Sequence, residues 1–88
     1  MRIRVRRTGG FAGIERSAEV DTAGRADAAE LHDLAETVVG QGDATERGVP
    51  DGFSYEITVD GKHTVRCRDP HLTDAQRALV STILAEGA

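Results

Sequence analysis

The chain has 88 residues, and its 15 acidic and 11 basic side chains give a formal net charge of −4 at pH 7. A chain of this length forms one domain with a small hydrophobic core, which leaves little room for a deep catalytic pocket. The negative charge argues against general nucleic-acid binding, because that affinity comes largely from neutralising phosphates with Lys and Arg. We therefore expect a single domain over residues 1–88.

The cysteine content and the N-terminal sequence indicate the cellular compartment in which the protein is expected. Cys67 is the single cysteine, so it cannot form an internal disulfide, and one thiol does not make a metal site. The N-terminal residues lack the continuous apolar run of a signal peptide, and no stretch approaches the roughly 18 apolar residues of a membrane span. These features predict a reduced, cytoplasmic, monomeric protein with no membrane partner.

Two strands are predicted at the N-terminus. Apolar Ile3 and Val5 alternate with arginines in residues 2–7, and Ala18 and Val20 alternate with polar residues, glutamates among them, in the following segment. Opposite charges on neighbouring antiparallel strands attract each other, which explains the arginine stripe structurally. The pattern predicts a hairpin with one apolar and one charged face.

The tip of this hairpin is rich in glycine. The segment Thr8-Gly9-Gly10-Phe11-Ala12-Gly13-Ile14 has three glycines within five residues, which allow the backbone to reverse. Phe11 is one of only two Phe and one Tyr in the chain. A glycine-framed aromatic ring on a hairpin tip either folds back as a lid on the core or is held out for a partner.

A helix and a long loop follow. Asp27-Ala28-Ala29-Glu30 has the form of a capping box, and apolar residues recur at helical spacing as far as Val38. We expect an amphipathic helix ending at Gly40, with His32 as a solvated surface residue. Residues 40–52 contain several glycines and a proline, which predicts a long, mobile loop.

The second predicted hairpin contains the clearest strand. Four apolar residues alternate with polar ones, and the facing strand has a matching inward set: Phe53, Tyr55, Ile57 and Val59 on the first strand, and His63, Val65 and Cys67 on the second. A type I turn with Gly61 as a left-handed bulge is predicted, which would pair Tyr55 with Val65. Cys67 is expected to face the core and to be inert.

A last helix closes the chain. Thr73-Asp74-Ala75-Gln76 is a second capping box, and the apolar residues after it share one helical face, namely Leu79, Val80, Ile83 and Leu84. The element order is therefore β-β-α-β-β-α. We expect an α+β fold, with one four-stranded antiparallel sheet whose apolar face is covered by both helices.

No motif indicates catalysis. The chain lacks a recognisable nucleophile-and-base arrangement, and its three histidines, His32, His63 and His71, are not spaced as zinc ligands. The glycine-rich tip is not followed by a helix, so it is not a phosphate loop. We expect a binding module rather than an enzyme, with no cofactor and no metal of its own.

Three segments carry a resemblance to a known family. They are Gly9-Gly10-Phe11-Ala12-Gly13-Ile14, the run from Asp51 to Gly61, and Asp69-Pro70-His71-Leu72. Together they resemble emfourin, the protealysin inhibitor family, over about residues 2–85, and the GGFAG tip is the most specific part. The resemblance implies a small bacterial inhibitor whose partner is a thermolysin-like zinc metalloprotease.

The up-and-down course of the chain predicts which residues would meet such a partner. It places the glycine tip, the loop at residues 40–52 and the corner at residues 69–72 at one end of the sheet, with Asp21 and Asp60 at the other. A carboxylate can occupy the open zinc position of a protease. The candidate partner-binding residues are Gly9, Gly10, Phe11, Ala12, Gly13, Asp43, Asp51, Asp69 and His71, and Asp69, Asp51 or Asp43 is the candidate to reach the partner's zinc.

Two alternatives belong to other classes. One is an intracellular interaction or nucleic-acid-binding module that uses the arginines of the open sheet face, namely Arg2, Arg4, Arg6, Arg66 and Arg68. The net charge and the interleaved glutamates count against it, and salt-sensitive RNA binding would distinguish it. The other alternative, an enzyme of unknown type, has no motif in its favour.

Overall fold

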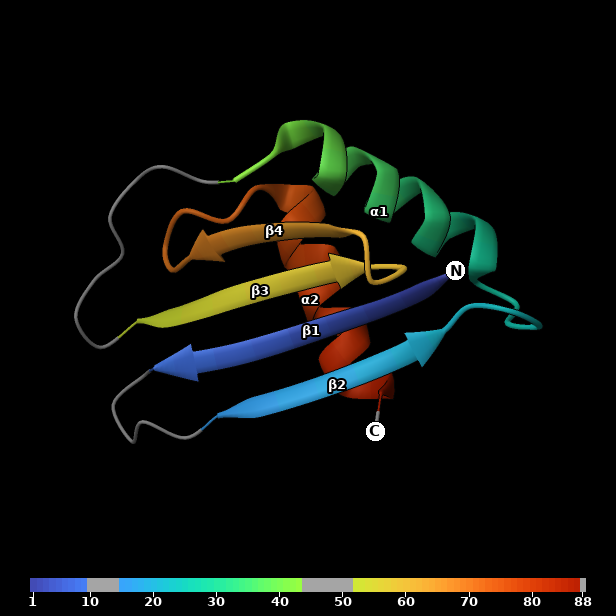
Figure 1. Ribbon diagram of the computed structural model, residues 1–88, viewed down its shortest axis with the longest axis horizontal. Coiled ribbons are helices and arrows are strands. Elements are labelled where there is room, and N and C mark those ends of the chain that lie inside the picture. Colours follow the sequence, from blue (N-terminus) through green and yellow to red (C-terminus); the bar gives the residue numbers. More distant parts are fainter. Residues whose placement is uncertain (10–14, 44–51, 88) are drawn as a thin grey trace.

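The computed structural model describes residues 1–9, 15–43 and 52–87. Its elements are β1 (Arg2–Gly9), β2 (Arg16–Asp21), α1 (Ala28–Gln41), β3 (Phe53–Val59), β4 (His63–Arg68) and α2 (Asp74–Glu86). The strands form one antiparallel sheet in the order β2-β1-β3-β4. Both helices lie on one face of this sheet, and α2 crosses behind its middle (Figure 1). The α+β fold expected from the sequence is confirmed.

The alternation of apolar and polar residues decides which face of each strand is buried. Along β1, Ile3 and Val5 are fully buried, whereas Arg2, Arg4 and Arg6 are exposed. The same alternation in the other strands, joined by α1 and α2, produces one core, whose buried apolar residues are Ile3, Val5, Ala18, Val20, Leu31, Ala35, Val38, Ile57, Val59, Val65, Cys67, Leu79, Val80, Ile83 and Leu84. Burial of this apolar surface is the main stabilising contribution to the fold.

The two helices begin differently. At α2, Thr73 Oγ1 accepts a hydrogen bond from the Gln76 backbone N–H at 3.1 Å, and Gln76 Oε1 accepts one from the Thr73 N–H at 2.9 Å. This reciprocal pair is the predicted capping box. At α1, Asp27 makes no side-chain cap, because its carboxylate instead binds Arg25 Nε at 2.8 Å, so the first predicted capping box is wrong. Helix α1 also ends at Gln41 rather than at Gly40.

The register of the second hairpin also differs from the prediction. Val65 lies opposite Ile57, and Tyr55 lies opposite Cys67 rather than Val65. The turn has positive φ at both Asp60 and Gly61, and Val59 lies opposite His63 across the three residues between them. The observed register is shifted by two residues from the predicted one, and side chains alternate with a period of two. Val65 and Cys67 therefore still face the core, as expected.

One of the two histidines assigned to these elements differs from expectation. His63 begins β4 on the same face as Val65 and Cys67, as predicted, and its place at the strand end leaves it exposed. His32, predicted to be solvated, is half-buried on α1, and its Nε2 atom lies 2.8 Å from Oγ1 of the buried Thr22. Thr22 Oγ1 in turn donates to the Met1 carbonyl at 3.1 Å. His32 therefore connects α1 to the segment after β2. Among the described residues, no helix is long and apolar enough to cross a membrane.

Candidate partner-binding site

The strand ends that carry the loops lie together at one end of the sheet. This end is here called the loop edge, and it is distinct from the outermost strands β2 and β4. Gly9 lies opposite Phe53 in the register, and the Asp69 N–H donates to the Phe53 carbonyl at 2.9 Å. At the opposite edge, Asp21 lies opposite Arg2, and the Asp60 N–H donates to the Arg2 carbonyl at 2.8 Å. Figure 1 shows these two edges at the two ends of the strands. The predicted grouping of segments is confirmed for the residues that the structure describes.

Gly9 ends β1 at this edge, where its backbone needs a glycine. Its φ of +86° lies in the left-handed region, and a Cβ atom built there would stand 3.1 Å from the Gly52 carbonyl oxygen. A larger residue would meet both backbone strain and crowding at this position. Five other candidate residues, Gly10, Phe11, Ala12, Gly13 and Asp51, lie outside the described residues.

Asp69 connects the end of β4 to the start of β3. Its Oδ2 atom accepts hydrogen bonds from the Phe53 N–H at 3.2 Å and from the Tyr55 hydroxyl at 3.4 Å. Burial, and then the nearby Asp69 carboxylate, raises the pKa of Tyr55. The Asp69 side chain is therefore engaged inside the protein as well as standing at the loop edge.

The two remaining candidates lie on the β4 side of the sheet. Asp43 Oδ1 accepts a hydrogen bond from the Arg66 backbone N–H at 2.8 Å, in an exposed position. This carboxylate therefore covers a backbone donor on the outer edge of β4. His71 is exposed, and its N–H donates to the Arg68 carbonyl at 2.8 Å in the turn after β4.

Arg7 is a residue of this edge that the sequence analysis did not single out. Its guanidinium carbon lies 4.3 Å from the centroid of the Phe53 ring, within the range of a cation–π contact. The Phe53 and Tyr55 rings are neighbours, with centroids 6.3 Å apart. Alternation along β1 could have located Arg7, because its odd position places it on the face of Ile3 and Val5. Arg7 and Asp69 thus hold the first aromatic residues of β3 in place.

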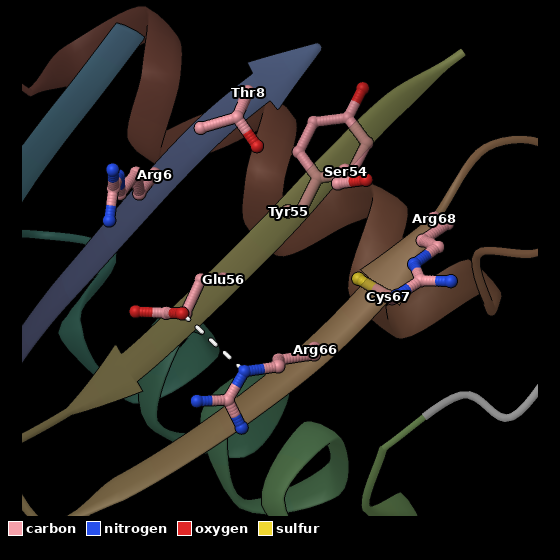
Figure 2. Close-up of a pocket in the computed structure, with 8 residues that line it drawn as sticks. All are labelled: Arg6, Thr8, Ser54, Tyr55, Glu56, Arg66, Cys67 and Arg68. Atoms are coloured by element: carbon pink, nitrogen blue, oxygen red, sulfur yellow. Dashed lines mark ion pairs between the residues drawn. The ribbon is translucent and has the colours of Figure 1, made fainter. Parts of the chain in front are cut away.

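The outer face of the sheet, which no helix covers, contains a shallow hollow of about 210 Å³ near the loop edge (Figure 2). Its outward-pointing side chains come from three neighbouring strands and are Arg6, Thr8, Ser54, Glu56, Arg66 and Arg68. The three arginines belong to the nucleic-acid alternative, whereas no role on this face was predicted for the two hydroxyl residues. Register, rather than sequence proximity, brings the six residues together.

Ion pairs neutralise much of the charge on this face. Arg2 Nε lies 3.0 Å from Glu19 Oε1, and Arg66 Nε lies 3.5 Å from Glu56 Oε2. Arg6 binds Glu15 through two hydrogen bonds, of 2.9 and 3.0 Å, which lower the pKa of the Glu15 carboxyl. The predicted attraction between the arginine and glutamate stripes is thereby confirmed.

Cys67 and the acidic side chains offer no metal site within the described part of the chain. No group of three or more His, Cys, Asp or Glu side chains there is placed to hold a metal ion. Cys67 is buried, and burial raises the pKa of its thiol to about 11, which keeps it protonated near neutral pH. A buried, protonated thiol is a poor nucleophile.

The sheet and the two helices define a small α+β domain. The sequence model of the Emfourin family matches residues 5–84, and the chain belongs to this family. Emfourin is an inhibitor family, so membership suggests an inhibitory role with a protease as partner and implies a protein that is not an enzyme. Comparisons with curated proteins and with solved structures found no match.

Proposed function

We propose that this protein is a stoichiometric inhibitor of a thermolysin-like, protealysin-type zinc metalloprotease. The observation that carries the proposal is the family match over residues 5–84. Such a protease binds an extended chain in a cleft beside a zinc ion with one open coordination position. An inhibitor of this kind needs a protruding apolar side chain and a nearby acid.

The loop edge supports this mode of binding. It joins the end of β1, from which the glycine tip continues, to the start of β3 and the end of β4. Asp69 and His71 stand in the turn that follows β4. We propose that the segment Gly9 to Gly13 enters the cleft and that Phe11 fills the apolar specificity pocket. Asp69, Asp51 or Asp43 is the acid proposed to approach the zinc.

The first test is the substitution Phe11→Ala, with inhibition of thermolysin as the readout. A hot-spot aromatic residue contributes about 2 kcal/mol or more, so the inhibition constant should rise at least about tenfold. The melting temperature should shift by only a few degrees. If the variant unfolds while its remaining folded fraction inhibits normally, Phe11 is a lid on the core instead.

The acid is tested by Asp43→Asn, Asp51→Asn and Asp69→Asn, each made separately. The side chain that binds the zinc must be ionised, so its loss should weaken inhibition more than loss of an exposed rim charge, which is often under about 1 kcal/mol. The other two variants serve as matched controls. If all three variants inhibit like the parent, the protein acts by blocking the cleft without a zinc ligand.

A further inference from the structure

On the outer sheet face, the row of residues nearest the loop edge consists of two hydroxyl residues and one arginine. Thr8 on β1 lies opposite Ser54 on β3, and Ser54 lies opposite Arg68 on β4. These three residues are here called the donor row, and Figure 2 shows them along one side of the hollow. Thr8 and Ser54 are half-buried, whereas Arg68 is exposed. The antiparallel register therefore places two hydroxyls and one guanidinium side by side.

The next row differs because its charges are already paired. Arg6, Glu56 and Arg66 lie opposite one another in the register, and each arginine there binds a carboxylate. The donor row itself contains no acid. Among the residues that the structure describes, Arg68 has no ion pair, and the Thr8 and Ser54 hydroxyls have no hydrogen-bond partner. On its donor-row side the hollow thus combines one arginine without an ion pair with two hydroxyl donors, and an anionic group complements this side.

We propose that the donor row binds a carboxylate of an acidic side chain on the protease partner, an inference that rests on the proposed function. A guanidinium binds a carboxylate through two parallel hydrogen bonds, and such charge-assisted bonds are stronger than neutral ones. The Thr8 and Ser54 hydroxyls can donate to the same group. The hollow of about 210 Å³ is large enough for a side chain, since one water molecule occupies about 30 Å³ of liquid.

The position of the donor row fits an interface that starts at the loop edge. A stable interface takes about 800 Å² from each partner, and the accessible surface of this protein totals 5411 Å². An interface of that size extends from the loop edge onto an adjoining face. The donor row is the first row on the outer face, one register position from the Gly9 and Phe53 pair.

A single carboxylate fits this surface better than a nucleic acid does. A polyanion needs several unpaired cations along its path, because its affinity depends on neutralising many phosphates. Here Arg2, Arg6 and Arg66 are bound to carboxylates of the same face, and the net charge of the chain is −4. Among the described residues of this face, Arg4 and Arg68 have no ion pair, but they lie in separate rows, so the surface offers local anion sites rather than a continuous path for a polyanion.

The experiment compares Arg68→Glu with Arg4→Glu in the inhibition of thermolysin. Arg4 is also exposed on the outer face, but it lies further from the loop edge, opposite Thr58 and Glu19. Both substitutions change the net charge equally, so any general electrostatic effect is shared. We expect Arg68→Glu to raise the inhibition constant at least about tenfold and Arg4→Glu to change it by less than about threefold. Ser54→Ala, which removes one donor and little volume, should weaken inhibition by a few-fold even if Arg68→Glu perturbs folding.

Three results would overturn the inference. If both charge-reversal variants and Ser54→Ala inhibit like the parent, the donor row does not contact the protease. If Arg68→Glu abolishes salt-sensitive binding of a single-stranded RNA probe but leaves inhibition unchanged, the row serves a nucleic acid instead. A parent protein that does not inhibit the protease at all refutes the proposed function itself, and this inference with it, so the two failures are distinguishable.

Discussion

Asp69 illustrates how a single side chain organises the loop edge. Its Oδ2 atom accepts from the Phe53 N–H and the Tyr55 hydroxyl, and its own N–H donates to the Phe53 carbonyl. Asp69→Ala should lower the free energy of unfolding by about 1–3 kcal/mol, because it leaves the half-buried Phe53 N–H without its acceptor. Asp69→Asn should cost less, since an amide oxygen can accept the same bonds.

Urea unfolding of the parent and of both Asp69 variants measures this difference. Asp43→Ala is a suitable control, because Asp43 is exposed and binds only at the outer edge of β4. Equal stability of Asp69→Ala and the parent would contradict the structural role of Asp69.

Cys67 supplies a prediction about pH. Burial raises the pKa of its thiol from 9.0 to about 11, and it raises the pKa of Tyr55 as well. The folded protein therefore binds more protons than the unfolded chain within this range, so stability is fully present below pH 9 and falls as the pH rises toward about 11. Chemical denaturation at several pH values should show this fall, with a shallower slope for Cys67→Ala. An equal slope in the two proteins would contradict the assignment to Cys67.

Sequence patterns predicted the burial of Cys67 but not the contacts of Asp69 and His32. Burial of Cys67 follows from alternation along its strand, which needs no knowledge of any partner. The contacts of Asp69 and His32 depend instead on residues brought close by the fold, since Asp69 meets Tyr55 and His32 meets Thr22. Alternation does place Arg7 on the core face, but its position over Phe53 arises from the β1 to β3 register.

At the level of elements, the second hairpin shows what alternation can and cannot predict. Alternation identified the strands and their buried faces correctly, but it allows every register that differs by two residues. The turn decides among these registers, and here both Asp60 and Gly61 adopt positive φ. The predicted type I turn, chosen to keep the apolar faces in phase, has only Gly61 left-handed, whereas an Asp-Gly pair also allows positive φ at both residues.

The two helix starts show a similar limit. Asp27 and Thr73 both begin segments with a capping-box pattern, but Arg25 binds the Asp27 carboxylate, and only Thr73 caps its helix. Thr73→Ala should therefore cost about 1 kcal/mol of stability, the typical value for loss of an N-cap. Asp27→Ala, which removes no cap, should cost less. Denaturant midpoints of the two variants measure the difference, and the reverse order would contradict the assigned caps.

For the whole molecule, the order β-β-α-β-β-α predicted both the sheet and the gathering of segments at the loop edge. Consecutive strands that run up and down must bring alternate connections to the same end, so this grouping follows from topology. The donor row could not be predicted in the same way, because it depends on the register of three strands. Its residues come from separate segments of the chain, at Thr8, Ser54 and Arg68.

The central claim is that this domain inhibits a thermolysin-like protease without catalysing a reaction. Titrating the purified protein into a fixed concentration of thermolysin tests the claim most directly, with residual cleavage of a peptide substrate as the readout. The account predicts that activity falls to a one-to-one end point and that the inhibitor remains intact. Full protease activity in the presence of excess protein, or digestion of the protein as a substrate, would contradict it.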